Sequence, residues 1–243
     1  MPTLILARHG RTPANASGVL AGRSKGVHLD EHGTAQATAA GERLTGLDLA
    51  AVVCSPLERC RETAKLLVPS AKATTDRRLL ECDYGDWTGA ELKKLAKEPL
   101  WRTVQAQPSA ARFPGGESLA EMSARTVGCV RERDAALAEE VGDHAVWLAV
   151  SHGDPIKAIL ADALGLHLDA FQRIMVDPGS LSVVRYTPHR SFVVTMNSSS
   201  GSLAHLASPP PKKRAGSRRR TPSSDAVVGG GAGPSTRPPT PSA

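Results

Sequence analysis

The sequence predicts an α/β fold, a three-layer α/β/α sandwich in which helices cover both faces of a mostly parallel central sheet. Three short apolar runs without polar alternation, over residues 3–7, 50–54 and 145–150, are typical of strands buried on both faces. Helical patterns separate these runs, and this alternation of strand and helix favours a parallel sheet. Two later runs, over residues 181–186 and 192–196, are expected to pair as a hairpin that completes the sheet.

The helical segments can be placed between the strands in chain order. Residues 29–47 are rich in alanine, and residues 118–139 set leucine, methionine and valine among charged side chains. After the second strand, Ser55 can cap a helix whose first position is Pro56, and the glutamate three residues after Ser55 completes a capping box. The apolar stripe of this helix leaves Arg59 off the buried face, so its side chain is expected to point over the strand ends.

The third strand is followed by a similar helix-start signal. Asp154 can serve as the cap, Pro155 suits the first helical position, and Gly165 can end the helix after an apolar stripe. The second and third strands are therefore each expected to turn directly into a helix.

The net charge of +6 is confined to the last 43 residues. Residues 201–243 hold seven basic side chains and one acidic, whereas residues 1–200 hold 23 of each. Because 21 of the 43 are Gly, Pro or Ser and none is aromatic, we expect a disordered basic tail behind one catalytic domain over residues 1–200. The tail could make weak, salt-sensitive contacts with nucleic acid, but it has no aromatic side chain to stack on bases, so a solvated appendage is favoured.

Several classes of protein are disfavoured by the rest of the composition. No apolar run reaches the roughly 18–20 residues that span a bilayer, and the N-terminus lacks a basic segment typical of a secretory signal, so a cytoplasmic location is expected. The cysteines form no Cys-x-x-Cys pair and the histidines show no metal-ligand spacing, which predicts buried thiols and neither metal nor cofactor. The oligomeric state stays open, with a dimer as one option.

Basic side chains follow all three of the buried strands. Arg8 and His9 follow the first strand, Arg59 lies on the helix after the second, and His152 and Gly153 follow the third. The carboxyl ends of parallel strands line one crevice, so these groups are expected to meet there beside helix N-termini and form an anion site suited to phosphate. Neutral imidazole is a nucleophile near pH 7, so one histidine could take up a phosphoryl group while the arginines stabilise its oxygens without a metal.

Five ordered motifs, together spanning about residues 3–198, resemble the histidine phosphatase superfamily. These are Arg8-His9-Gly10, the segment 55–59, Glu81 within the segment 80–89, the segment 115–118, and Ser151-His152-Gly153. The resemblance implies that His9 is the phosphorylated nucleophile and that Arg8, Arg59 and His152 complete the phosphate pocket. It also implies that Glu81 gives a proton to the leaving oxygen and then takes one from water.

The same resemblance suggests further substrate-binding residues. Asn15 matches a position that contacts phosphate in many members, and Gly22 lies where a loop backbone often does. Gly153 allows the backbone to approach the anion closely. Tyr84 and Trp87 could wall the substrate pocket or fill the core, and the sequence leaves both options open.

The main alternatives within the superfamily are a phosphatase and a phosphoglycerate mutase-like phosphomutase. The mutases typically have an Arg directly after the catalytic Glu and a Lys about eleven residues beyond it, but Cys82 and Leu92 stand at those places here. The segment 114–118 also resembles the short phosphatases, including ribazole phosphatases and actinobacterial members. We therefore expect a phosphatase acting on a phosphorylated small molecule, with the phosphomutase as the alternative; the natural substrate is not predicted.

Overall fold

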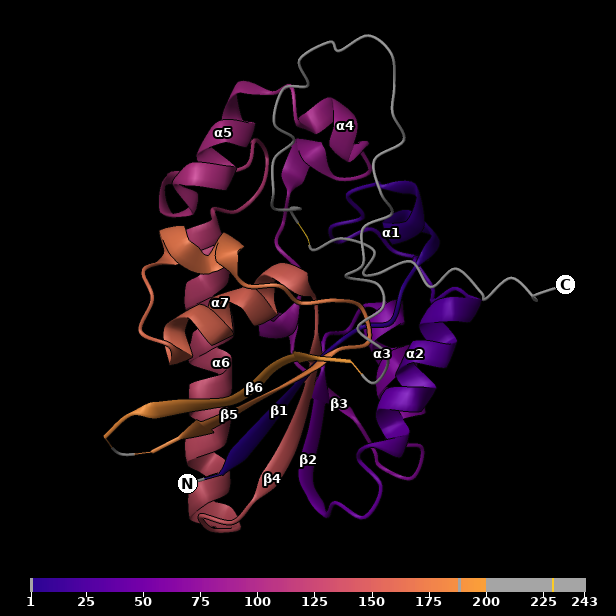
Figure 1. The fold of residues 1–243 in the computed structure, drawn as a ribbon, viewed down its shortest axis with the longest axis vertical. Coiled ribbons are helices and arrows are strands. Elements are labelled where there is room, and N and C mark those ends of the chain that lie inside the picture. Colours follow the sequence, from indigo (N-terminus) through magenta and orange to yellow (C-terminus); the bar gives the residue numbers. More distant parts are fainter. Residues whose placement is uncertain (1, 188, 200–228, 230–243) are drawn as a thin grey trace, which may run out of the picture.

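The computed structural model describes residues 2–187 and 189–199, together with Gly229. The disorder and nucleic-acid contacts expected for residues 201–243 therefore lie outside the described residues, Gly229 aside. The predicted fold class is confirmed, since helices cover both faces of a six-stranded sheet with the order β3-β2-β4-β1-β5-β6 (Figure 1). The pairs β2/β3, β2/β4 and β1/β4 are parallel, and the pairs β1/β5 and β5/β6 are antiparallel, as the predicted hairpin requires.

The predicted helices and strands occur in the predicted order, and the described residues also form one strand, three short α-helices and several 3-10 helices that the sequence did not predict. The strands are β1 (Thr3–Arg8), β2 (Leu49–Cys54), β3 (Thr74–Thr75), β4 (Val146–Ser151), β5 (Leu181–Tyr186) and β6 (Ser191–Ser198). The α-helices are α1 (Pro13–Ser17), α2 (Glu31–Glu42), α3 (Glu58–Leu67), α4 (Leu92–Leu95), α5 (Pro99–Ala106), α6 (Leu119–Glu140) and α7 (Gly153–Ala163). Short 3-10 helices cover Arg77–Leu79, Gly85–Trp87, Pro108–Ala110 and Leu168–Arg173.

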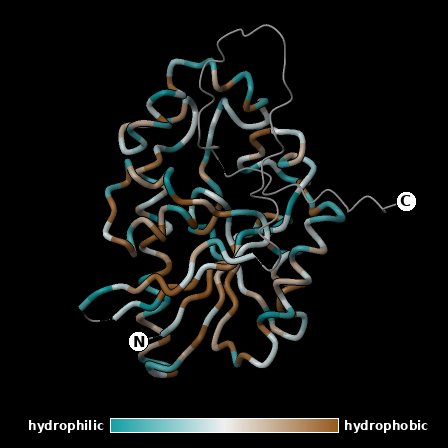
Figure 2. The backbone as a smooth tube through the Cα atoms, in the orientation of Figure 1, coloured by the Kyte–Doolittle hydropathy of each residue, from teal (hydrophilic) through white to brown (hydrophobic). Residues whose placement is uncertain are grey.

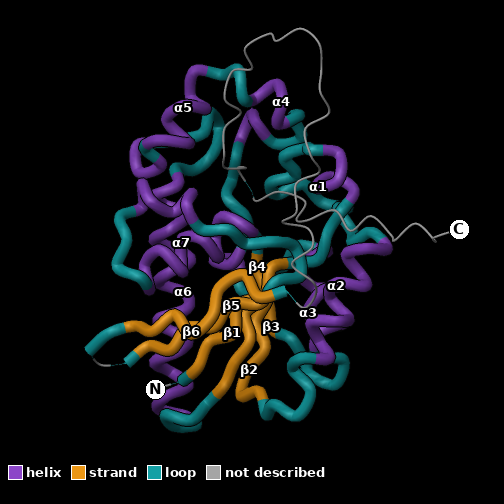
Figure 3. The backbone as a smooth tube through the Cα atoms, viewed as in Figure 1, coloured by secondary structure: helices purple, strands orange, loops and turns teal. Residues whose placement is uncertain are grey.

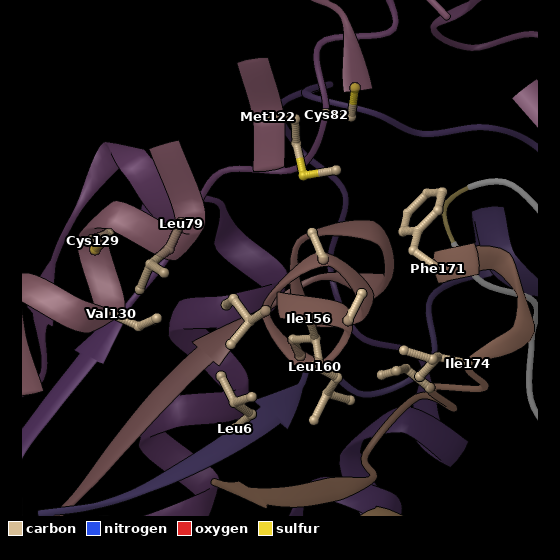
Figure 4. Packing of buried hydrophobic residues seen from close by; sticks show 14 of the residues in the cluster. Leu6, Leu79, Cys82, Met122, Cys129, Val130, Ile156, Leu160, Phe171 and Ile174 are labelled. Carbon is tan, nitrogen blue, oxygen red and sulfur yellow. The ribbon is translucent and has the colours of Figure 1, made fainter. Parts of the chain in front are cut away.

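The central strands are buried on both faces, which explains their unbroken apolar sequences. In β1, Leu4 and Leu6 belong to the core cluster on the α6/α7 side, whereas Ile5 and Ala7 belong to the cluster on the α2/α3 side. Figure 2 shows these hydrophobic stretches along the sheet, and Figure 4 shows Leu6 beside α7. The sheet is thus a rigid support for the loops at its carboxyl edge.

The short helices α1, α4 and α5 form a cap beyond the carboxyl ends of the strands (Figure 3). The segments 18–20 and 89–92 join two parts of this cap through backbone hydrogen bonds. Leu20 N–H donates to the Ala90 carbonyl at 2.9 Å, and Gly89 N–H donates to the Leu20 carbonyl at 2.7 Å. The segment after α1 is thereby held against the start of α4, over the strand ends.

Two predicted helix caps are wrong. Helix α3 begins at Glu58, and the buried hydroxyl of Ser55 is instead hydrogen-bonded to His152 Nε2 at 2.8 Å. Helix α7 begins at Gly153 with His152 as its N-cap, and Asp154 lies buried in the first turn. In both cases the polar side chain that the local sequence predicts as a cap is hydrogen-bonded to a residue far away in the chain, His152 for Ser55 and Tyr84 for Asp154.

The prediction of small buried thiols is confirmed, because all four cysteines are free and buried. Within residues 2–187 and 189–199, no helix combines the length and apolar character that crossing a membrane requires.

Candidate active site

The carboxyl ends of β1 and β4 place the two predicted histidines side by side. The strands pair in parallel register with Arg8 opposite Ser151, and the His9 backbone N–H donates to the Ser151 carbonyl at 3.0 Å. The next residue on each strand is a histidine, and the ring centroids of His9 and His152 lie 5.2 Å apart. The adjacency of the two imidazoles therefore follows from strand register.

The loop after β1 turns in a space that admits only glycine. A Cβ atom on Gly10 would lie 2.3 Å from the carbonyl oxygen of Gly33 in α2. The Gly10 N–H donates to Thr63 Oγ1 of α3 at 3.1 Å, which ties the loop to the helix that carries Arg59. These contacts hold His9 between α2 and α3.

His9 is held as a neutral imidazole with an unprotonated Nε2. Its Nδ1 lies 2.7 Å from the Gly10 carbonyl, to which only a protonated Nδ1 can donate. Arg59 Nε–H donates to His9 Nε2 at 3.3 Å, and that bond requires a lone pair on Nε2. Burial, then the positive charges of Arg59 and Arg8, lower the pKa of His9 well below its ordinary value. His9 thus has the protonation state of a nucleophile at neutral pH.

His152 is also kept neutral, by similar forces. Burial, then Arg59 and His9, lower the pKa of His152 well below its ordinary value. Cys60 lies beside this ring, with Sγ 3.4 Å from His152 Nε2, and its thiol donates to the Ser151 carbonyl at 3.5 Å. Because burial raises the pKa of Cys60, its thiol stays protonated and acts as packing, not as a reactive thiolate.

Two buried guanidinium groups supply the positive charge of the site. Arg8 donates through Nη1 to the Val176 carbonyl at 2.7 Å, and Arg59 donates through Nη2 to the Gly22 carbonyl at 2.7 Å. The buried Nη1 of Arg59 has no hydrogen-bond partner among the described residues. An unpaired buried donor on a cation is unfavourable until an anion binds, so this nitrogen is suited to an oxygen of phosphate.

Glu81 supplies an acid group to the same cavity. Its carboxyl group is buried, and Oε1 accepts the Cys82 backbone N–H at 2.9 Å. Burial, followed by the negative charge of Asp154, raises the pKa of Glu81 to about 8. Glu81 therefore holds its proton at neutral pH and can donate it.

The structure brings the predicted site residues to one cavity and its floor. Five of the eight line the cavity wall, namely His9, Asn15, Gly22, Arg59 and Glu81. The other three are buried: Arg8 precedes His9 in the chain, the His152 ring lies 5.2 Å from the His9 ring, and Gly153 follows His152. Asn15 also acts locally, because its Oδ1 accepts from the backbone N–H and the hydroxyl of Thr12 at 3.1 and 2.9 Å.

Sequence reasoning missed two residues of the site region, Asp154 and Gly229. Asp154 accepts the hydroxyl of Tyr84 at 2.8 Å, and Tyr84 lines the cavity as well as filling the core, so both options left open for it hold. Gly229 also lines the cavity; its carbonyl accepts from Arg8 Nη2 at 3.1 Å and its N–H donates to Asp154 Oδ2 at 3.2 Å. The sequence feature that could have pointed to Gly229 is the run of three glycines that begins there, inside a tail rich in Pro, Ser and Arg.

Paired imidazoles and guanidiniums at the carboxyl ends of parallel strands, facing a protonated carboxyl group, are characteristic of an enzyme that acts on phosphate esters. The sequence pattern of the histidine phosphatase superfamily (branch 1) matches residues 4–199. The chain therefore belongs to this superfamily, and it is an enzyme of the histidine phosphatase type.

Relatives described as a mutase and as phosphatases each match more than four fifths of this chain. A protein of Salmonella choleraesuis described as a probable phosphoglycerate mutase, GpmB, is 31% identical over 86% of this chain and 97% of its own length. The structure of the alpha-ribazole phosphatase from Shigella flexneri is 26% identical, with a TM-score of 0.69 over 81% of this chain and 96% of that one. A mycobacterial glucosyl-3-phosphoglycerate phosphatase is 27% identical, with a TM-score of 0.72 over 81% and 99%.

Proposed function

We propose that the protein hydrolyses a phosphomonoester in two steps through a phosphohistidine on His9, without a metal ion. The observation that carries this proposal is a neutral His9, with its Nε2 lone pair beside Arg59, sharing one cavity with a carboxyl group that is protonated at neutral pH. One group is a nucleophile and the other an acid, and each is in the required protonation state.

In the first step, His9 Nε2 attacks phosphorus and the bond from phosphorus to the ester oxygen breaks. Glu81 gives its proton to the departing oxygen, so the alcohol leaves neutral and Glu81 becomes a carboxylate. In the second step, water attacks the phosphohistidine while Glu81 takes up the proton of the water. The N–P bond then breaks and inorganic phosphate is released, with His9 and Glu81 restored.

The remaining site residues stabilise the transferring group. Arg8 and Arg59 offer guanidinium donors to its oxygens, and His152 completes the pocket from the end of β4. Gly153 begins α7, so the backbone N–H groups of the first turn are directed toward bound anions. Asn15 and Gly22 act from the cavity wall, Asn15 as a substrate contact and Gly22 by fixing Arg59 through its carbonyl.

Hydrolysis is favoured over phosphoglycerate isomerisation by the apolar part of the cavity wall. Val19, Leu20 and Leu92 line the cavity there, and Arg59 is the only Lys or Arg among the described wall residues. A carboxylate on the leaving group would be desolvated against this apolar surface without forming an ion pair, which is unfavourable. Two of the similar structures are phosphatases, but the curated relative is described as a mutase, so a phosphomutase is the second candidate.

The proposal is tested with His9→Ala in the full-length protein. Release of phosphate from p-nitrophenyl phosphate in the presence of EDTA should be abolished, whereas the matched variant His144→Ala, at an exposed position, should retain it. Rapid quenching of the wild type should trap a phosphoenzyme that is labile in acid and stable in base. Full activity of His9→Ala would refute the mechanism.

A second assay separates the two candidate functions. The wild type is incubated with 2- and 3-phosphoglycerate, and products are resolved by NMR. Free phosphate as the product supports the phosphatase, and the positional isomer supports the phosphomutase.

A further inference from the structure

Two arginines from distant parts of the chain meet on the backbone of the proposed acid. The main-chain carbonyl of Glu81 accepts from Arg23 Nε at 2.9 Å and from Arg125 Nη2 at 3.0 Å. Arg23 lies in the loop after α1, and Arg125 lies on α6. One hydrogen bond is enough for a buried peptide carbonyl, so a second charged donor on the same oxygen points to a further role.

Glu117 joins the two arginines into one unit. Its carboxylate accepts from Arg23 Nη2 at 2.7 Å and from Arg125 Nη2 and Nε at 2.6 and 3.0 Å. The Asp83 backbone N–H also donates to Glu117 Oε1, at 2.8 Å. We call Arg23, Glu117 and Arg125 the arginine clamp.

The arginine clamp holds the chain on both sides of Glu81. Arg125 Nη1 donates to the carbonyls of Arg78 and Leu80 at 2.6 and 2.8 Å, before Glu81, while Glu117 holds Asp83 after it. The Arg125 and Glu117 side chains are 19% and 16% exposed, so these bonds are largely shielded from water. Although burial opposes it, Arg125 lowers the pKa of Glu117, which keeps the carboxylate charged.

We propose that the arginine clamp is a positioning device for the proton donor, an inference that rests on the acid role of Glu81 in the proposed function. Glu81 lies in an irregular segment between two 3-10 helices, so no regular secondary structure fixes its backbone. The clamp supplies that constraint and sets the distance from the Glu81 carboxyl group to the leaving oxygen. General acid catalysis requires hydrogen-bond geometry, so the proton transfer is sensitive to small displacements of this backbone.

The test compares substrates whose leaving groups differ in their need for a proton. A nitrophenolate leaves without one, whereas an alkoxide requires one. Arg125→Gln should therefore lower kcat/KM for an alkyl phosphate about 10²-fold, within the range that general acid catalysis contributes. The loss on p-nitrophenyl phosphate should be only a few-fold. Arg125→Lys, which retains one charge but not the forked geometry, should fall between.

Matched controls separate positioning from general damage to the fold. Arg131 lies on the same helix, and Arg131→Gln removes its ion pair with Asp162. This variant should leave kcat/KM unchanged for both substrates. If Arg125→Gln does not fold, Arg23→Gln, whose side chain is 29% exposed, carries the same test. Equal losses on both substrates, or no loss, would overturn the clamp as a positioning device.

A reference variant distinguishes failure of this inference from failure of the proposed function. Glu81→Gln should show the strongest dependence on the leaving group. If it shows none, the acid role itself is refuted and the clamp proposal falls with it. If Glu81→Gln shows the dependence and the clamp variants do not, only the clamp proposal is refuted.

Discussion

Asp154→Asn should move the pH range in which Glu81 can donate a proton. Burial, then the charge of Asp154, raises the pKa of Glu81 to about 8. Asparagine keeps the size of Asp154 and an oxygen for the Tyr84 hydroxyl, but it removes the charge. The pKa of Glu81 should fall without reaching its ordinary value, because burial, the larger cause, remains.

The size of the effect follows from the titration of a single carboxyl group. With a pKa of about 8, roughly 90% of Glu81 is protonated at pH 7, and each unit by which Asp154→Asn lowers that pKa corresponds to about 1.4 kcal/mol of lost interaction. Activity on an alkyl phosphate should therefore fall several-fold at pH 7, where the acid form is depleted, and change little at pH 5.

The assay is the pH profile of kcat/KM for an alkyl phosphate. A raised carboxyl pKa means that the acid form persists as pH rises, so the wild type should lose activity only as pH approaches and passes about 8. The loss should begin at lower pH in Asp154→Asn, and not in Asp162→Asn on the same helix, whose carboxylate pairs with Arg131. An unchanged alkaline limb in Asp154→Asn would refute this account of the Glu81 pKa.

Three further predictions concern the same cavity. The lowered pKa of His9 should keep kcat/KM for p-nitrophenyl phosphate high well below pH 6.5, and an acid limb at the ordinary histidine value would contradict it. Leu92→Lys should raise kcat/KM for 3-phosphoglycerate relative to an alkyl phosphate whose leaving group is uncharged, because it places a cation on the apolar wall; an unchanged ratio would count against that wall as the leaving-group site. Gly229→Val should lower KM for p-nitrophenyl phosphate with kcat retained, because Gly229 occupies a donor of Arg8 and has a φ of +74°, which valine resists. The control Gly233→Val should behave as wild type, and equal KM values would show that Gly229 does not compete with substrate.

The parts of the site that the sequence predicts are those carried by local pattern and strand register. Arg8, His9 and His152 lie at the ends of buried strands, so the strand pattern alone predicts that they lie close together. Glu81 lies in an irregular segment, and only the family resemblance pointed to it. The Asp154–Tyr84 bond and the arginine clamp join residues far apart in the chain, and no periodicity or spacing encodes such contacts.

The two helix caps that the sequence predicts wrongly have a common physical cause. Ser55 and Asp154 have the residue types that cap helices in isolation, yet each is buried and bonded to a group of the site, His152 for Ser55 and Tyr84 for Asp154. As a result neither α3 nor α7 has a side-chain hydrogen bond at its N-cap. Omitting a cap costs about 1 kcal/mol of helix stability, but it leaves first-turn N–H groups without a side-chain acceptor at the carboxyl edge of the sheet. A bound phosphate can supply that acceptor. Because Ser55 and Asp154 bond to residues of the site and do not cap α3 and α7, both helix N-termini favour anion binding where the strands end.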